Sequence, residues 1–167
     1  MPASHPSSLV ERSVEVPEPG PHDVVVDVHA VSVNPVDVKL RAGSPPGKFR
    51  VLGFDAAGTV RSVGAAVTLI HPGDDVFYAG SIDRPGTNQR IHVVDERIVG
   101  RKPSSLSFAE AAALPLTAIT AWESLFDRLG LTSDSKGTLL VIGATGGVGS
   151  IMLELVEALL PHVSVIA

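Results

Sequence analysis

Apolar and polar residues alternate along residues 22–33. One face of this segment carries Val24, Val26 and Val28. A period of two with one apolar face is typical of a half-buried β-strand, because successive side chains point to opposite sides of a sheet. Four shorter strand-like runs follow, separated by segments rich in Gly, Pro and Asp, at 58–63, 75–79, 89–94 and 97–100. Residues 8 to about 101 are therefore predicted to be all-β.

The pattern changes at Ser107. This residue and Glu110 have the spacing of a capping box, in which the hydroxyl and the carboxylate each accept a hydrogen bond from the other's backbone amide. An alanine-rich run follows, so we predict a short helix that Pro115 ends or kinks. Residues 117–129 then carry apolar side chains at helical spacing and end at Gly130, which predicts a second helix.

The last part of the chain reads as strand, helix and strand. A continuous apolar run over 137–143 indicates a strand covered on both faces, as in a parallel sheet. Apolar residues recur at helical spacing over 147–160, and Pro161 blocks continuation of that helix. A second apolar run at 163–167 would be reached by a right-handed crossover. This order predicts the first βαβ unit of a Rossmann fold.

A glycine-rich turn joins the first of these strands to the helix. In the register of the dinucleotide fingerprint, Ala144 takes the first glycine position, and Gly146 and Gly149 take the second and third. Small residues there would let a pyrophosphate approach the backbone and the free amides of the helix start. We predict a cofactor site at Ala144, Thr145, Gly146, Gly147, Val148 and Gly149. A plain tight turn built from small residues is the alternative.

Composition and charge narrow the function classes. The chain has 167 residues, 44% of them hydrophobic, and a mean hydropathy of +0.30, which favours a globular domain with a real core. A net charge of -5 disfavours nucleic acid as a partner. The most apolar stretch, 111–122, is too short to span a bilayer, so no membrane partner is expected. The first 13 residues lack the features of a signal peptide, and we expect a cytoplasmic location.

The chain contains no cysteine, and its six histidines are scattered without a pair at ligand spacing. Disulfides, thiolate metal sites and cysteine nucleophiles are therefore excluded, and no metal site is predicted. No serine stands in a nucleophile-elbow context and the carboxylates form no acid/base pair, which disfavours a hydrolase.

Four segments, in this order and spacing, resemble the medium-chain dehydrogenase/reductase superfamily in its quinone oxidoreductase branch. They are 32–43 (SVNPVDVKLRAG), 53–60 (GFDAAGTV), 111–125 (AAALPLTAITAWESL) and 142–149 (IGATGGVG). The stretch 76–103 is more narrowly similar to the zinc-type alcohol dehydrogenase-like proteins.

The resemblance implies a mixed β and α/β fold class. A GroES-like β-barrel catalytic domain would cover 1–106, a helical connection 107–136, and an incomplete Rossmann unit 137–167. In this superfamily, nicotinamide and substrate meet in the cleft between the two domains. The family's first strand, a few residues before 7–16, is expected to be shortened or missing, which would leave a barrel edge unpaired.

Two further departures from the family pattern affect the chemistry. Zinc alcohol dehydrogenases have a cysteine where this chain has Asn34 and a metal-binding histidine where it has Phe54, so the resemblance implies a zinc-independent protein. The segment 87–92 (TNQRIH) replaces the small, aromatic and acidic pattern that is common in the family.

The resemblance also implies roles for individual residues. Asn34 and Asp37 would line the substrate side, and Thr120 would lie near the nicotinamide carboxamide. Tyr78, the only tyrosine, is a candidate proton or hydrogen-bond donor. Trp122 is expected to be a core residue.

Each candidate has a structural alternative. Asn34 could bond its own backbone in a turn, and Asp37 could cap a short segment at 38–41. Thr120 could bond back to a helix carbonyl, and Tyr78 could be a packed strand residue with a satisfied hydroxyl.

The leading hypothesis is an NAD(P)H-dependent oxidoreductase that transfers a hydride to a quinone, an enone or a related carbonyl compound. NADPH is favoured over NAD, although the selecting residue would lie after Ala167. One alternative is a non-catalytic nucleotide-binding or interaction module. Another is a truncated fragment that is inactive by itself, because a two-stranded parallel sheet cannot bury both faces. The resemblance allows a homodimer of the full-length protein.

Overall fold

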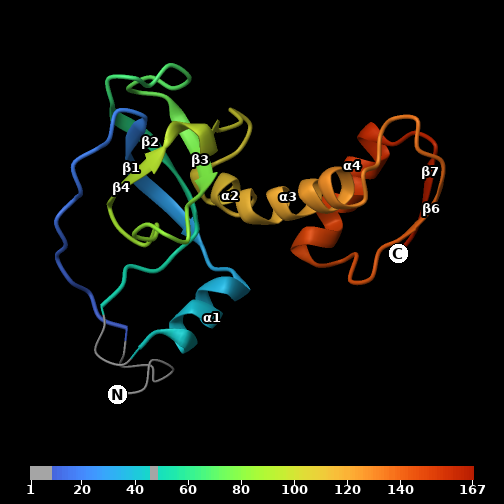
Figure 1. Cartoon of the computed structure of the whole chain (residues 1–167), viewed down its shortest axis with the longest axis horizontal. Coiled ribbons are helices and arrows are strands. Elements are labelled where there is room, and N and C mark those ends of the chain that lie inside the picture. Colours follow the sequence, from blue (N-terminus) through green and yellow to red (C-terminus); the bar gives the residue numbers. More distant parts are fainter. Residues whose placement is uncertain (1–8, 46–48) are drawn as a thin grey trace. The chain divides into compact units, whose positions relative to one another are not determined.

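The computed structural model describes residues 9–45 and 49–167. The chain forms two compact units, the first ending at Pro115 and the second covering Leu116–Ala167 (Figure 1). The first unit is mainly β, and the second combines helices with a parallel strand pair, as the mixed class predicts. Within the described ranges, no helix is both long enough and apolar enough to cross a membrane.

The first unit is built on a five-stranded antiparallel sheet with the order β4-β1-β2-β3-β5. Its strands are β1 (Asp23–Ser32), β2 (Asp55–Val63), β3 (Asp75–Ala79), β4 (Ile91–Asp95) and β5 (Val99–Arg101). β1 pairs with β2 on one side and β4 on the other, so β4 and β5 form the edges. Residues 9–20 contain no strand, and residues 1–8, where the family's first strand is expected, lie outside the described residues.

Among the strand boundaries that differ from the sequence-based prediction, the start of β2 has a non-local cause and the start of β5 a local one. β2 begins three positions before Gly58, because residues 55–57 pair with both β1 and β3 although their composition is poor in strand formers. The predicted run 97–100 instead begins with a 3-10 turn, η2 (Glu96–Ile98). There the Asp95 carboxylate accepts a hydrogen bond from the Arg97 amide, and this local bond competes with strand pairing.

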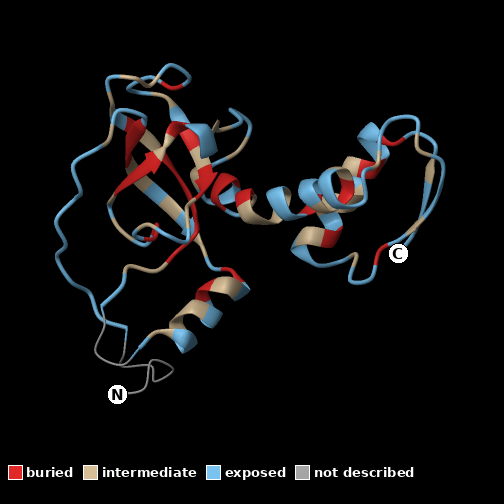
Figure 2. Cartoon of the chain, viewed as in Figure 1, coloured by how far each residue is buried: buried red, intermediate tan, exposed pale blue. Residues whose placement is uncertain are grey.

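The core of the first unit is formed mainly by side chains of this sheet. Val24 and Val26, which the alternating pattern placed on one face, are fully buried, and Figure 2 shows the buried residues concentrated on the central strands. The core cluster comprises Val24, Val26, Ala56, Val60, Ile70, Val76, Tyr78 and Val94. Helix α2 (Phe108–Ala112) packs its alanines against Ala57 on β2.

The capping box that predicted α2 is confirmed. The Glu110 carboxylate accepts from the Ser107 amide at 2.8 Å, and the Ser107 hydroxyl accepts from the Glu110 amide at 3.3 Å. These bonds satisfy amides that have no partner within the helix. The helix ends at Ala112, and Pro115 begins the next helix, where its missing amide proton costs nothing.

The second unit is a helical segment followed by a βαβ unit. Helix α3 (Pro115–Trp122) continues into the π-helical turn η3 (Glu123–Arg128). Strand β6 (Gly137–Leu140), helix α4 (Gly147–Leu159) and strand β7 (Val163–Ile166) follow, and β6 and β7 pair in parallel. The predicted order of strand, helix and strand is therefore confirmed. β6 is shorter than the apolar run 137–143, although the Val141 amide still bonds to the Ile166 carbonyl at 2.8 Å.

A small apolar core holds the second unit together. Leu125, Val156 and Leu160 are buried at its centre. The expectation that Trp122 is a core residue is wrong, because the residue is 49% exposed; its ring packs against that of Phe126, 4.5 Å away. The π-helical turn widens the helix after Trp122, so the stripe predicted from regular helical spacing no longer faces one way.

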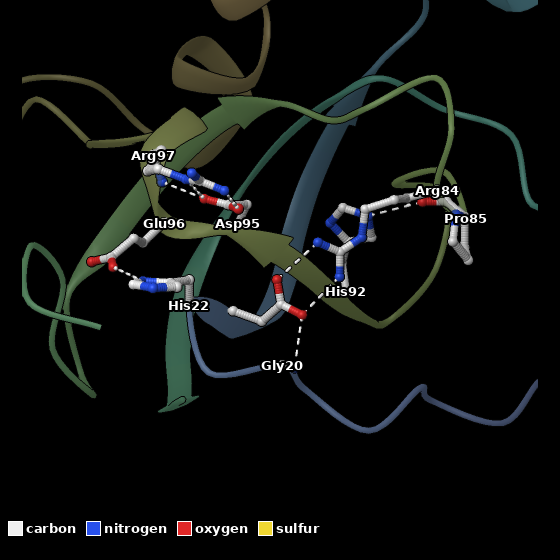
Figure 3. A network of polar contacts seen from close by, with 9 residues as sticks. Gly20, His22, Arg84, Pro85, His92, Asp95, Glu96 and Arg97 are labelled. Carbon is white, nitrogen blue, oxygen red and sulfur yellow. Dashed lines mark hydrogen bonds and ion pairs between the residues drawn. The ribbon is translucent and has the colours of Figure 1, made fainter. Parts of the chain in front are cut away.

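One polar chain runs through the core of the first unit. The Tyr78 hydroxyl lies 3.0 Å from Nδ1 of His92. On the other side of the ring, Nε2 of His92 lies 3.1 Å from the Pro85 carbonyl (Figure 3). A carbonyl can only accept, so Nε2 carries the ring proton and Nδ1 accepts from the tyrosine. Burial lowers the pKa of His92 and raises the pKa of Tyr78.

The buried His92 makes stability depend on pH. In the folded chain the buried ring takes up a proton at a lower pH than in the unfolded chain, where its ordinary pKa is about 6.5. The unfolded state therefore binds more protons, and the free energy of unfolding falls as the pH drops from about 7 to about 5. We expect His92→Gln to flatten this part of the pH profile in urea unfolding followed by circular dichroism.

His162→Gln is the matched control, because the His162 side chain is exposed rather than enclosed in the core. Carboxylates with lowered pKa, such as Asp23 and Glu96, act at lower pH and do not overlap this window. An unaltered slope between about pH 7 and about pH 5 in His92→Gln would contradict the assignment of a neutral ring.

Candidate functional site

The substrate-side candidates lie where β1 ends and helix α1 (Pro35–Gly43) begins. Asn34 is the residue before the helix, and Pro35 occupies its first position. The Asp37 carboxylate accepts a hydrogen bond from the Asn34 backbone amide at 2.8 Å, which is the acidic half of a capping box. The alternative in which Asp37 caps a segment at 38–41 is therefore wrong, because the helix starts three residues earlier.

Asn34 is fixed by its side-chain amide. Nδ2 donates to the Asp55 carboxylate at 2.8 Å and lies 3.4 Å from the Ser32 hydroxyl, which itself donates to Asp55 at 3.0 Å. Asn34 is 8% exposed and Asp55 is fully buried. The amide nitrogen is thus bonded to β2. The amide oxygen completes the capping box with the backbone amide of Asp37, so the local side-chain-to-backbone bonding that the alternative expected is present as well.

Sequence reasoning missed Asp55. The residue stands at the start of an apolar, alanine-containing strand, and a carboxylate in such a run must find hydrogen-bond donors if it is buried. That composition was the available signal. The partners could not be predicted, because they come from residues 21 and 23 positions away in the chain.

One oxygen at this site has no partner in the residues that the structure describes. Oδ1 of Asp37 is buried and makes no hydrogen bond, whereas Oδ2 is held by the Asn34 amide. An unsatisfied buried acceptor costs about 1–3 kcal/mol, so such atoms call for an explanation. A hydroxyl or amide donor from a bound molecule would satisfy Oδ1.

The hydroxyl groups of the other two side-chain candidates already make hydrogen bonds within the fold. The Tyr78 hydroxyl bonds to His92 in the core and the residue is 2% exposed, so we withdraw it from the candidate catalytic residues. The Thr120 hydroxyl donates to the Leu116 carbonyl at 2.7 Å, which is the back-bond of a helical threonine. In this conformation its proton is already used, and its role toward nicotinamide stays a prediction.

The cofactor candidates lie on the turn between β6 and α4. Gly143 adopts a left-handed φ of +77°, which reverses the chain after the strand. A Cβ on Gly149 would stand 2.4 Å from the Gly143 carbonyl oxygen and 2.6 Å from Cα of Ala144. Only glycine permits this close approach of the helix to the turn. The third fingerprint position therefore has the packing role that the pattern predicts.

The first backbone amides of α4 have no hydrogen-bond acceptor within the helix. Gly146 precedes the helix without a side-chain cap, and the first turn contains no acidic residue. The first intrahelical bond runs from the Ser150 amide to the Gly146 carbonyl, so the preceding amides of Gly147, Val148 and Gly149 have no acceptor within the helix. Ala144 and Thr145 are solvent-accessible beside them. The residues present fit the pyrophosphate of a dinucleotide, because amides and the positive helix end attract it.

The residues at the zinc positions do not fit a zinc ion. Phe54 offers no ligand atom, and the Asn34 amide nitrogen is directed at Asp55. Zinc in proteins is bound by thiolate, imidazole or carboxylate groups. In the described part of the chain, no three His, Cys, Asp or Glu side chains are gathered to hold a metal.

Comparison with known proteins identifies the family. The sequence profile of the alcohol dehydrogenase GroES-like domain matches residues 20–122, which is more than half of the chain. The chain belongs to this family. The match covers the five-stranded sheet, α1 and α2, so the GroES-like assignment from the sequence is confirmed.

Curated relatives of this chain are medium-chain dehydrogenases/reductases. It is 41% identical over 151 residues to a zinc-type alcohol dehydrogenase-like protein of Staphylococcus epidermidis, covering 88% of this chain and 45% of the relative. It is 38% identical over 162 residues to the 2-methylene-furan-3-one reductase of Solanum lycopersicum, covering 89% and 40%. The chain thus spans less than half the length of these two relatives.

Solved structures support the same grouping. A putative zinc-dependent alcohol dehydrogenase from Rhizobium etli superposes with a TM-score of 0.88 and 50% identity, covering all of this chain and 50% of that one. The Escherichia coli quinone oxidoreductase complexed with NADPH gives a TM-score of 0.71 and 29% identity, covering 93% and 46%. The mixed fold class and the superfamily resemblance are both confirmed.

Two glycines of the turn are expected to respond differently to alanine. Gly149→Ala places a Cβ against backbone atoms that cannot move aside, so we expect the second unit to lose about 1–3 kcal/mol of stability. Gly146→Ala meets only the Gly143 carbonyl at 3.3 Å and keeps an extended backbone, so its effect should be smaller. Hydrogen exchange of the α4 amides, read by mass spectrometry, measures both.

Equal protection of α4 in the two variants would argue against the packing role of Gly149. Ser150→Ala provides the control, since its exposed hydroxyl bonds only to the Gly147 carbonyl within the same helix.

Proposed function

We propose that the whole protein is a zinc-independent oxidoreductase that uses NADPH to reduce a quinone, an enone or a related carbonyl compound. The family relationship supports an oxidoreductase of the medium-chain superfamily. The observation that carries the cofactor assignment is the start of α4, which has no side-chain cap and follows a turn that requires glycine at Gly149. NADPH is favoured because the Escherichia coli quinone oxidoreductase, a structural neighbour of the chain, is complexed with it.

The second unit would hold the cofactor. Backbone amides of Gly147, Val148 and Gly149 would donate to the pyrophosphate, and the missing side chain of Gly146 would let it approach. Bound NADPH would supply the hydride. No acidic residue stands in the first turn to repel the phosphates.

The first unit would supply the substrate side. Asp37 Oδ1 is the buried acceptor without a partner among the described residues, so it is suited to a hydroxyl of the substrate or of the cofactor. Asn34 lies beside it with its amide orientation fixed. A group that is held before the substrate arrives does not have to be ordered during the reaction, which lowers the barrier.

Turnover is the direct test. We expect the whole protein to oxidise NADPH in the presence of a panel of quinones and enones, measured as loss of nicotinamide absorbance. Deuterium from NADPH labelled at C4 should appear in the reduced enone. NADPH binding without turnover would favour the non-catalytic module, and the absence of both would overturn the proposal.

Metal removal tests the prediction that activity does not depend on zinc. Because the residues at Asn34 and Phe54 provide no zinc ligand, dialysis against a chelator should leave kcat and KM unchanged. The check is turnover before and after dialysis, together with metal analysis of the purified protein. A stoichiometric zinc ion whose loss abolishes turnover would refute zinc independence.

Gly146→Ala tests the cofactor site without disturbing the packing. The added methyl would stand at the surface where the pyrophosphate approaches, so we expect NADPH affinity to fall about tenfold or more, a loss of about 1.4 kcal/mol. Titration calorimetry on the whole protein measures this, with Ser150→Ala as the control. Undiminished affinity would place the cofactor elsewhere.

A further inference from the structure

Asp55 is the most deeply buried acidic residue among the described residues of the first unit. It is fully buried at the start of β2, where its backbone pairs with Ser32 on β1 and with Ala79 on β3. Its backbone carbonyl accepts a further hydrogen bond from the buried Thr87 hydroxyl at 3.1 Å. The residue is therefore held rigidly from two strands and one loop.

Packing does not explain a carboxylate at this position. The neighbouring residues of the strand, Ala56 and Ala57, are small and apolar, and a third alanine at Ala79 lies opposite. Burying a carboxylate costs free energy unless donors compensate, and an apolar residue of similar volume is often neutral or stabilising in such a place. The carboxylate is thus expected to have a role other than filling space.

The contacts of Asp55 define that role. Nδ2 of Asn34 donates to Asp55 Oδ2, so the NH2 end of the amide faces Asp55. The oxygen of the same amide faces the first turn of α1, where it completes the capping box with the backbone amide of Asp37. A second bond from the Ser32 hydroxyl to the same carboxylate oxygen holds the arrangement from the β1 side.

We propose that Asp55 is a positioning residue, which sets the orientation of Asn34 and with it the substrate side at the start of α1. The inference rests on the proposed function, because it assigns Asn34 to the substrate. Without Asp55, the amide could rotate and exchange its donor and acceptor ends. The capping box between Asn34 and Asp37, which fixes the start of α1 and the position of the Asp37 carboxylate, would then be lost in a fraction of the molecules.

The structural part is tested in the 167-residue chain itself. In the NMR spectrum, the side-chain amide protons of Asn34 should exchange slowly with water, and Asp55→Ala should make them exchange as fast as those of an exposed amide such as Asn88. Asp75→Ala, which removes an exposed carboxylate on β3, should leave them unchanged. Fast exchange of the Asn34 amide in the unmodified chain would overturn the proposal.

The functional part uses the whole protein and a double-mutant cycle. Asp55→Ala should lower kcat/KM for the quinone by about 100-fold, as displacement of a positioned group does, while KM for NADPH stays within about twofold. The same substitution in an Asn34→Ala background should have little further effect, because the group it positions is gone. Asp55→Asn keeps an acceptor oxygen and should restore part of the loss.

The outcomes separate this inference from the proposed function. An equal loss from Asp55→Ala in both backgrounds, or a parallel rise in KM for NADPH, would mean a general structural role and would overturn the positioning role alone. If Asp55→Ala does not fold, the cycle is run with Asp55→Asn, whose loss should also vanish in the Asn34→Ala background. Absence of turnover in the unmodified protein would overturn the proposed function and this inference together.

Discussion

The requirement that a buried polar group find a partner shapes the first unit. A polar side chain removed from water costs several kcal/mol unless hydrogen bonds replace its hydration. Glu96 is 3% exposed and accepts from the amides of Thr68 and Leu69 and from the His22 ring (Figure 3). Each bond joins segments that are far apart in the chain. The polar groups thus fix the loops to the sheet, while the valine core fixes the strands to one another.

The segment that departs from the family pattern takes part in this network. Thr87 is fully buried and bonds to the Asp55 carbonyl, and His92 bonds to Tyr78 and to the Pro85 carbonyl. The same loop is also held at Arg84, whose guanidinium makes two bonds to the Asp23 carboxylate and lowers its pKa. The changed residues are therefore well integrated in the fold.

The fold was predictable where the pattern is local. The alternation of apolar and polar residues predicted β1, and the pair of Ser107 and Glu110 predicted the start of α2. The apolar run with its glycines predicted the βαβ unit. The failures arise where a regular period is interrupted or where pairing is non-local. Trp122 was misplaced because a π-helical turn interrupts the helical period, and the start of β2 was missed because its pairing partners lie on two other strands.

In the candidate site, too, some features follow from the residue pattern and others do not. The glycine positions of the turn follow from the residue pattern alone, since a close backbone approach leaves only one residue type possible at Gly149. Asn34 and Asp37 came from the family resemblance, and their actual contacts required coordinates. Tyr78 illustrates why a chemically suitable residue is not a site, because its hydroxyl is enclosed in the core.

The donors at the start of α4 are main-chain amides, and this has a consequence for how the turn behaves in different conditions. Such groups have no proton to lose in the physiological range and no side chain to oxidise or modify. Any dependence of phosphate binding on acidity at this turn must therefore come from the ligand's own ionisation. Evolution can likewise vary Ala144 and Thr145 without altering the donors, provided that the curvature of the chain is preserved.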